Sequence, residues 1–146
     1  MSTQATPATA KGLVATASVT IDAGKDEVWK ALTTPETIKK YMFGADTETD
    51  WQPGSPITWK GEWEGKPFED TGEIIANESE KRLQYSHKSG KDPSGNIHTV
   101  TYELSGTDNE TTVTVTQDNN PDQKTLESST QNWQTMLDGL KKAVEG

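Results

Sequence analysis

The amino-acid sequence predicts an α+β domain in which a curved antiparallel sheet wraps round one long C-terminal helix. Between residues 14 and 116, apolar and polar residues alternate in several short segments, as they do in half-buried strands. Residues 125–144 instead place their apolar side chains on one helical stripe, formed by Leu126, Trp133, Met136, Leu137, Leu140 and Val144. A sheet with one apolar face and a single amphipathic helix bury these surfaces against each other, which favours this arrangement.

The chain has 146 residues and a net charge of −9, with Arg82 as its single arginine. This length is typical of one domain. Residues 1–11 are small and polar and are predicted to form a disordered tail, which leaves residues 12–146 as the domain. The absence of cysteine excludes a disulfide framework and suits a cytoplasmic protein. The acidic charge argues against nucleic-acid and membrane partners, and no apolar run is long enough to span a membrane.

The first strand is predicted at residues 14–21, where apolar residues alternate with threonine and serine. A short helix follows, with Asp26 and Glu27 in its first turn, where acidic side chains interact favourably with the helix dipole. Thr34 and Pro35 then begin a second short helix, with threonine as the N-cap and proline as the first helical residue. Two helices in tandem are therefore expected to connect the first strand to the rest of the sheet.

About six further strands are predicted, with a short one near residues 46–50 and longer ones from residue 57 onwards. The pair Ile74 and Ile75 interrupts the alternation, which indicates a bulge or burial on both sides. Short turns join consecutive strands, so the sheet is predicted to be an antiparallel meander. Asp122 is the expected N-cap of the long helix, and Lys141 and Lys142 lie where its C-terminus favours cations.

Several segments resemble bacterial members of the activator of heat-shock-protein-90 ATPase homologue family: VTIDAGKDEVWKALTTPETIKKYM, DWQPGSPITWKGEWEGKPFEDTGEI, EKRLQYSH, HTVTYELSGTDNETTVTVTQDNN and NWQTMLDGLKK. That family belongs to the START-like (SRPBCC, helix-grip) superfamily, which also includes birch-pollen allergens and polyketide cyclases. The resemblance runs from about Val14 to Glu145. It implies a curved sheet of about seven strands, two short helices after the first strand, and a cavity under the long helix. The family shares no catalytic residue set, so the resemblance assigns none to this chain.

The candidate site is a pocket for a small hydrophobic ligand between the sheet and the long helix. Alternation places the strand aromatics on the same interior as the helix, whose first half carries only the small Ser129 and Thr130 on its core side. Small side chains opposite large ones leave a gap, although a normally filled core explains the same residues. The predicted pocket-lining residues are Met42, Phe43, Trp59, Trp63, Tyr85, His87, Tyr102, Ser129, Thr130, Trp133 and Leu137.

No cofactor or metal site is predicted. His87 and His98 are the only histidines, and both fall on inward positions of strands that can pair. We expect them to be structural, with a pocket hydrogen-bonding group or a general base as the alternative. Asp46, Glu48 and Asp50 lack the glycine turn and distal glutamate of an EF-hand. No phosphate-binding loop, GxSxG elbow or HExxH motif occurs.

Three functions remain open. The sequence favours a monomeric, non-enzymatic protein that holds a small hydrophobic molecule beneath the long helix. The second is a chaperone-associated protein resembling the heat-shock-protein-90 ATPase activator. Against it, the extra N-terminal domain and the NxNNWHW-type segment of those co-chaperones have no counterpart in this chain. The third is a cyclase- or hydrolase-like enzyme, which would need polar groups that converge in the pocket.

Overall fold

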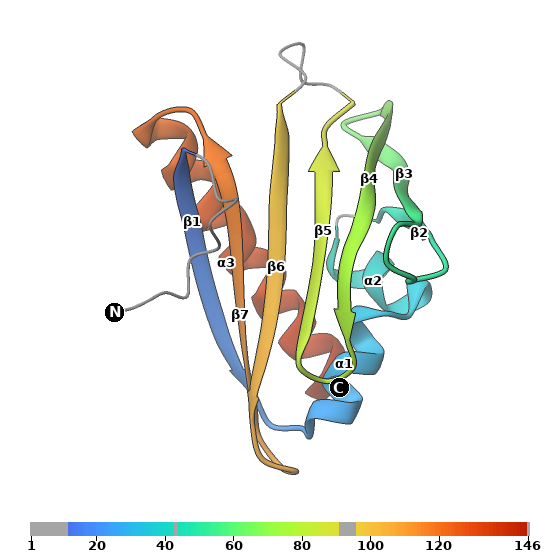
Figure 1. Cartoon of the computed structure of the whole chain (residues 1–146), viewed down its shortest axis with the longest axis vertical. Helices are drawn as coiled ribbons and strands as arrows, with labels where there is room; N and C mark the ends of the chain where they lie inside the picture. Colours follow the sequence, from blue (N-terminus) through green and yellow to red (C-terminus); the bar gives the residue numbers. More distant parts are fainter. Residues whose placement is uncertain (1–11, 43, 91–95, 146) are drawn as a thin grey trace.

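The structure is a computed structural model that describes residues 12–42, 44–90 and 96–145, without the side chain of Trp63. It shows one sheet with its helices on one side (Figure 1). The elements in chain order are β1 (Leu13–Ile21), α1 (Lys25–Leu32), α2 (Pro35–Tyr41), β2 (Asp46–Glu48), β3 (Pro56–Trp63), β4 (Lys66–Glu78), β5 (Arg82–Lys88), β6 (Ile97–Gly106), β7 (Thr111–Asn120) and α3 (Gln123–Glu145). The predicted order of strands and helices is confirmed.

All strand pairs are antiparallel, and the order across the sheet is β1-β7-β6-β5-β4-β3-β2. Strands β2 to β7 therefore form the predicted meander, and β1 pairs with β7, the last strand in the chain. The register of β4 on β5 shifts between Ile74 and Ala76, which confirms the bulge predicted at the double isoleucine. Ile74 is fully buried, whereas Ile75 is 44% exposed.

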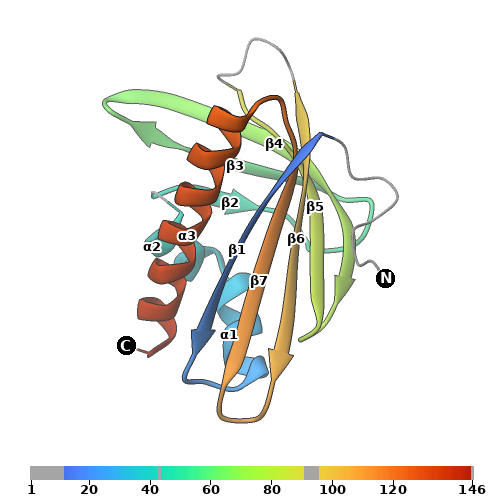
Figure 2. The same ribbon diagram turned by 90° about the vertical axis from the view of Figure 1, so that its left-hand side faces the viewer.

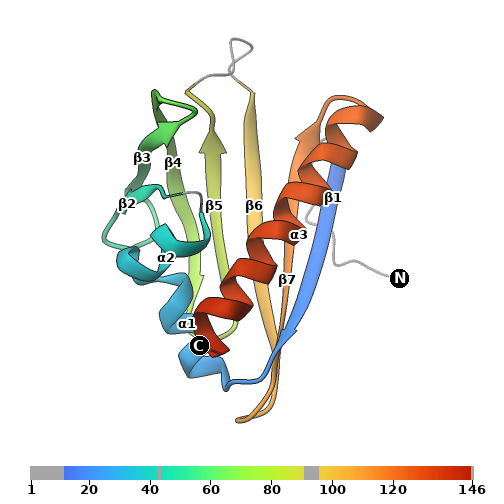
Figure 3. The same cartoon turned by 180° about the vertical axis from the view of Figure 1, so that it is seen from behind.

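Helix α3 crosses the face of the curved sheet and supplies its cover (Figures 2 and 3). Its start matches the prediction, because the backbone N–H of Thr125 donates to Oδ1 of Asp122 at 2.8 Å. The fully buried apolar side chains come from the sheet, α1 and α3: Ile21, Val28, Ile57, Ile74, Leu83, Val100, Val113, Val115, Leu137 and Leu140. Among the described helices, none is both long and apolar enough to cross a membrane.

Helices α1 and α2 close the end of the domain near the C-terminal half of α3 (Figure 3). Gly139 allows α2 to approach, since a Cβ at this position would lie 3.1 Å from Cβ of Tyr41. The hydroxyl of Tyr41 in turn donates to the carbonyl oxygen of Ala31 at 3.1 Å, which ties α2 to α1. This end of the domain is therefore sealed by direct packing of three helices.

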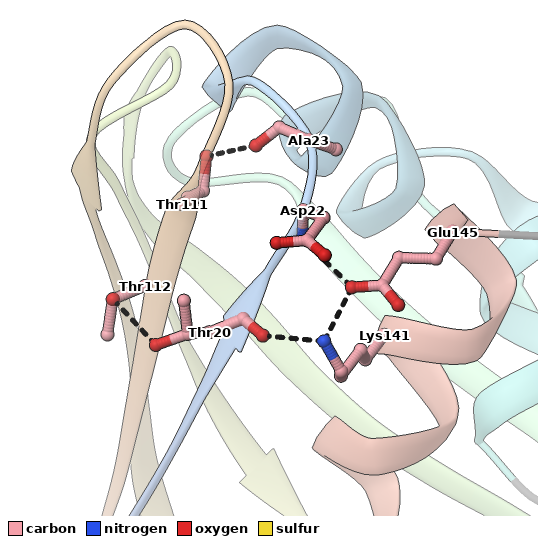
Figure 4. Close-up of polar contacts among 7 residues, drawn as sticks. All are labelled: Thr20, Asp22, Ala23, Thr111, Thr112, Lys141 and Glu145. Carbon is pink, nitrogen blue, oxygen red and sulfur yellow. Dashed lines mark hydrogen bonds and ion pairs between the residues drawn. The ribbon is translucent and has the colours of Figure 1, made fainter.

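The outer edge of β1 is covered by polar side chains of α3, as Figure 4 shows for Thr20 and Asp22. Nζ of Lys141 donates to the carbonyl oxygen of Thr20 at 2.9 Å, and the N–H of Asp22 donates to Oε2 of Glu145 at 2.9 Å. Lys141 and Glu145 also pair with each other at 2.5 Å. About two helical turns before Lys141, Nε2 of Gln134 donates to the carbonyl oxygen of Ser18 at 3.2 Å. These contacts occupy backbone groups that an exposed edge strand would offer to another chain.

Candidate functional site: a cavity between α3 and the sheet

A cavity of about 490 Å³, partly open to solvent, lies between the first half of α3 and the sheet. Its volume falls within the range of small-molecule sites, roughly 300–1,000 Å³. The residues that line it are Met42, Ala45, Trp59, Phe68, Asp70, Tyr85, His87, Ser89, Val100, Gln117, Ser129, Asn132, Trp133 and Met136. The cavity is therefore lined by both apolar and polar side chains from α3, the five strands β3 to β7 and the α2–β2 region.

The cavity lies where α3 carries small or polar side chains. Ser129 and Asn132 face the space beside Trp133. One turn further on, the bulky Met136 lines the end of the cavity, and Leu137 is fully buried in the core. The side chains on this face of α3 thus change from small to bulky along the helix. The N-terminal half leaves a space between helix and sheet, and the C-terminal half fills it.

Aromatic rings form the floor of the cavity. The ring of Trp59 lies 5.1 Å from those of both Tyr85 and His87, measured between centroids. Tyr102 lies behind Tyr85, and its ring meets that of Trp133 edge-on at 6.0 Å. The hydroxyl oxygens of Tyr85 and Tyr102 are 3.0 Å apart, and burial raises the pKa of both phenols. Both therefore stay protonated at neutral pH, and one hydroxyl donates to the other.

On the β7 side, hydrogen bonds fix the orientation of the polar groups. Nε1 of Trp133 donates to Oε1 of Gln117 at 3.0 Å. Because an indole N–H can only donate, the amide oxygen of Gln117 must face it, and Nε2 is directed elsewhere. The hydroxyl of Ser129 donates to Oδ1 of the buried Asn120 at 2.8 Å, while Nδ2 of Asn120 donates to the carbonyl oxygens of Leu13 and Gln117 at 3.0 Å. Asn120 therefore joins α3 to β1 and β7.

On the opposite side, His87 and Asp70 form a half-buried pair at 2.9 Å between Nε2 and Oδ2. Oδ1 of Asp70 accepts the backbone N–H of Gly90 at 2.9 Å. Two glycines permit this approach. A Cβ at Gly72 would lie 1.8 Å from the carbonyl oxygen of Ser86, and a Cβ at Gly90 would lie 2.1 Å from that of Glu69. The backbone of this corner thus brings the carboxylate of β4 to the imidazole of β5.

The two histidines pair across β5 and β6 as predicted, with ring centroids 6.4 Å apart, but their surroundings differ. His87 lines the cavity. His98 does not line it, and its Nδ1 bonds with the carbonyl oxygen of Asp118 at 2.8 Å.

Six residues expected to line the pocket do so: Met42, Trp59, Tyr85, His87, Ser129 and Trp133. Tyr102 instead lines a separate void of about 10 Å³ behind Tyr85. Thr130 is half-buried and donates its hydroxyl to the carbonyl oxygen of Leu126 in its own helix at 2.8 Å, and Leu137 is fully buried in the core. The predictions for Phe43 and for the side chain of Trp63 lie outside the described residues.

Several lining residues were not predicted from the sequence. Phe68 and Asp70 could have been found by extending the inward alternation of β4 back from Ile74. Gln117 continues the inward series of Val113 and Val115 on β7. Asn132 lies outside the apolar stripe of the long helix. It is exposed, yet it reaches the cavity, because it lies three residues after Ser129.

The acidic residues at β2 are engaged by lysines. Asp46 pairs with Lys39 at 3.1 Å, and Glu48 pairs with Lys60 at 3.7 Å. Within residues 12–42, 44–90 and 96–145, no group of three or more His, Asp or Glu residues could hold a metal ion.

Comparisons with known proteins place the chain among proteins of the same fold. The family model described as "Activator of Hsp90 ATPase homolog 1-like protein" matches residues 22–145. The solution structure of ChR145 from Cytophaga hutchinsonii is 45% identical, with a TM-score of 0.78, and the match covers 92% of this chain and 95% of that one. The comparison with curated proteins gives no match.

Two more distant structures show the fold alone. The crystal structure of CV1439 from Chromobacterium violaceum has a TM-score of 0.79 at 18% identity, over 91% of this chain and 97% of that one. The solution structure of the Aha1 dimer from Colwellia psychrerythraea has a TM-score of 0.72 at 21% identity, over 91% and 96% of the two chains.

Proposed function

The chain belongs to the family of Activator of Hsp90 ATPase homolog 1-like proteins, and we propose that it binds a small hydrophobic molecule without catalysing a reaction. The observation that supports this proposal best is the cavity of about 490 Å³ under the first half of α3. Four aromatic side chains contribute to its lining: Trp59, Phe68, Tyr85 and Trp133. Its size and its lining of aromatic and other apolar side chains, interspersed with polar groups that can orient a ligand, fit a small-molecule site.

The proposal includes the other expectations from the sequence. We take residues 12–146 to be one domain that acts in the cytoplasm as a monomer without a cofactor. The covered edge of β1 supports the monomer, because α3 already contacts the backbone groups at Ser18, Thr20 and Asp22. The absence of cysteine supports a reducing compartment.

Binding can be tested with N-phenyl-1-naphthylamine, a flat apolar probe that becomes fluorescent in apolar surroundings. We expect micromolar affinity, equivalent to about −8 kcal/mol. The variant Ser129→Leu should weaken binding at least about tenfold, because the longer side chain occupies the cavity. Binding no tighter than millimolar in the unaltered protein would refute the proposal.

Two control variants separate filling of the cavity from other effects. Ser129→Ala removes the hydrogen bond to Asn120 but leaves the space open, so it should still bind the probe. Ser128→Leu makes the same substitution as Ser129→Leu at an exposed position next to it, and should bind like the unaltered protein. If Ser128→Leu weakened binding as much as Ser129→Leu, the probe would not be in this cavity.

A chaperone-associated role is the second candidate, and the family description is what favours it. We expect little or no stimulation of a chaperone ATPase by this chain. A several-fold increase in ATPase rate at stoichiometric protein would make this second candidate the better proposal.

A further inference from the structure

The pair formed by His87 and Asp70 determines which nitrogen of the imidazole carries the hydrogen. An ionised carboxylate can only accept hydrogen bonds. Both oxygens of Asp70 are engaged, Oδ1 by the N–H of Gly90 at 2.9 Å and Oδ2 by Nε2 of His87 at 2.9 Å. Nε2 must therefore be the donor, so the hydrogen of the neutral ring lies on Nε2 and Nδ1 carries a lone pair.

That lone pair has no hydrogen-bond donor among the described residues. The ring itself is held firmly, because it packs edge-on against Trp59 at 5.1 Å and lies 6.4 Å from His98. His87 lines the cavity beside these apolar neighbours. An acceptor whose orientation is fixed by a second residue, at the wall of a cavity with an aromatic floor, is the kind of polar group that confers specificity on a ligand site.

We propose that Nδ1 of His87 accepts a hydrogen bond from the ligand, so that the cavity selects flat aromatic molecules that carry a hydroxyl group. This inference rests on the proposed binding function and adds the chemical class of the ligand. Asp70 is the positioning residue, since it holds the hydrogen on Nε2. A ligand that can only accept at this point leaves two acceptors facing each other, which makes the site discriminate against it.

The test uses three probes of nearly the same shape: biphenyl, 4-hydroxybiphenyl and 4-methoxybiphenyl. The hydroxyl can donate, whereas the methoxy oxygen can only accept. Dissociation constants are measured at pH 8 from the quenching of tryptophan fluorescence. We expect 4-hydroxybiphenyl to bind about tenfold more tightly than 4-methoxybiphenyl, the usual size of one hydrogen bond.

The variant Asp70→Asn gives the sharpest result. The N–H of Gly90 still needs an acceptor, so the amide oxygen of the new side chain faces Gly90 and its NH₂ group faces Nε2 of His87. The hydrogen of the neutral ring then moves to Nδ1, which becomes a donor. The hydroxyl probe should then bind about as weakly as the methoxy probe.

Two histidine variants serve as a matched pair. His87→Phe keeps a flat ring and removes both nitrogens, so it should abolish the preference between the hydroxyl and methoxy probes. His98→Phe makes the same change on the neighbouring strand, at a ring that does not line the cavity, and should leave the preference intact. If His98→Phe removed the preference as fully as His87→Phe, a general change of packing would explain the result and the inference would fail.

Imidazole ¹⁵N chemical shifts provide a readout that needs no ligand, because they distinguish protonated from unprotonated nitrogens. We expect His87 to show its hydrogen on Nε2 in the unaltered protein, which tests the argument even if the Asp70→Asn protein does not fold. A hydrogen on Nδ1, or equal binding of the hydroxyl and methoxy probes while biphenyl binds, overturns this inference alone. No binding of any of the three probes counts against the proposed function itself.

Discussion

The two halves of α3 meet the rest of the domain through different interactions. In the C-terminal half, Met136, Leu137 and Leu140 are buried, and Gly139 lets Tyr41 of α2 pack directly against the helix. In the N-terminal half, Trp133 is only half-buried, and the space beneath the helix is the cavity. One half of the helix is thus held by the apolar core, and the other spans an opening.

Hydrogen bonds replace apolar burial where the helix spans the cavity. The hydroxyl of Ser129 bonds to Asn120, and the indole of Trp133 bonds to Gln117. Both partners belong to β7, so the helix stays attached to the sheet beside the cavity without filling it. One helix can therefore complete a core with one half and leave room for a ligand with the other. A few directional hydrogen bonds hold the N-terminal half in place without close packing of apolar side chains beneath it.

The largest effect on stability is expected in the C-terminal half of α3, whose side chains are buried in the apolar core. Leu137→Ala should lower the free energy of unfolding by about 3 kcal/mol, since it removes a fully buried side chain and leaves a void. Urea denaturation measures this value. The exposed Gln131→Ala on the same helix should change it by less than about 0.5 kcal/mol. A loss below about 1 kcal/mol for Leu137→Ala would contradict the close packing of this half of α3 in the apolar core.

A smaller loss is expected where hydrogen bonds hold the N-terminal half of α3 to β7. Asn120→Ala should lower the free energy of unfolding by about 2 kcal/mol. It leaves the carbonyl oxygens of Leu13 and Gln117 and the hydroxyl of Ser129 without their partner. The same denaturation experiment applies. Asn132→Ala removes an exposed amide from α3 and should be nearly neutral. Equal stability of these two variants would contradict the anchoring role of Asn120.

Trp133→Phe should have a smaller effect, about 1 kcal/mol, since the ring stays apolar but its hydrogen bond to Gln117 is lost. The comparison with Gln117→Leu sharpens the result. If the two residues act only through this bond, the double variant should lose little more stability than either single one. Fully additive losses would show that the bond does not couple them.

The smallest effect is expected at the covered edge of β1, where the N–H of Asp22 and then Lys141 lower the pKa of Glu145. A lowered folded-state pKa contributes stability that is fully present above the ordinary value of 4.5 and is lost as the pH falls through the folded value. Glu145→Gln should therefore lower Tm slightly at pH 6, and this difference should shrink as the pH falls below about 4.5. A difference that is the same at pH 6 and pH 2.5 would exclude the carboxylate as its source.

Local patterns in the sequence were sufficient for the elements of this fold. Alternation marked the strands, Thr34 with Pro35 and Asp122 marked two helix starts, and Ile74 with Ile75 marked the bulge, because each depends on neighbours in the chain. The apolar face of the strands and the apolar stripe of the long helix together predicted a curved sheet around the C-terminal helix, and the structure confirms it. The small residues of α3 also indicated a gap under the first half of the helix, where Ser129, though not Thr130, lines the cavity.

What the sequence could not determine depends on contacts between distant segments. Its alternation places His87 on an inward face, but only the bulged register of β4 and the close approach at Gly72 bring Asp70 to that ring. Likewise, Leu137 and Ser129 share one helical stripe, and which of them meets open space depends on where α2 seals the sheet. Periodicity determines the direction of a side chain relative to its own element, whereas its partner across the fold is decided by register and packing, which only the tertiary structure supplies.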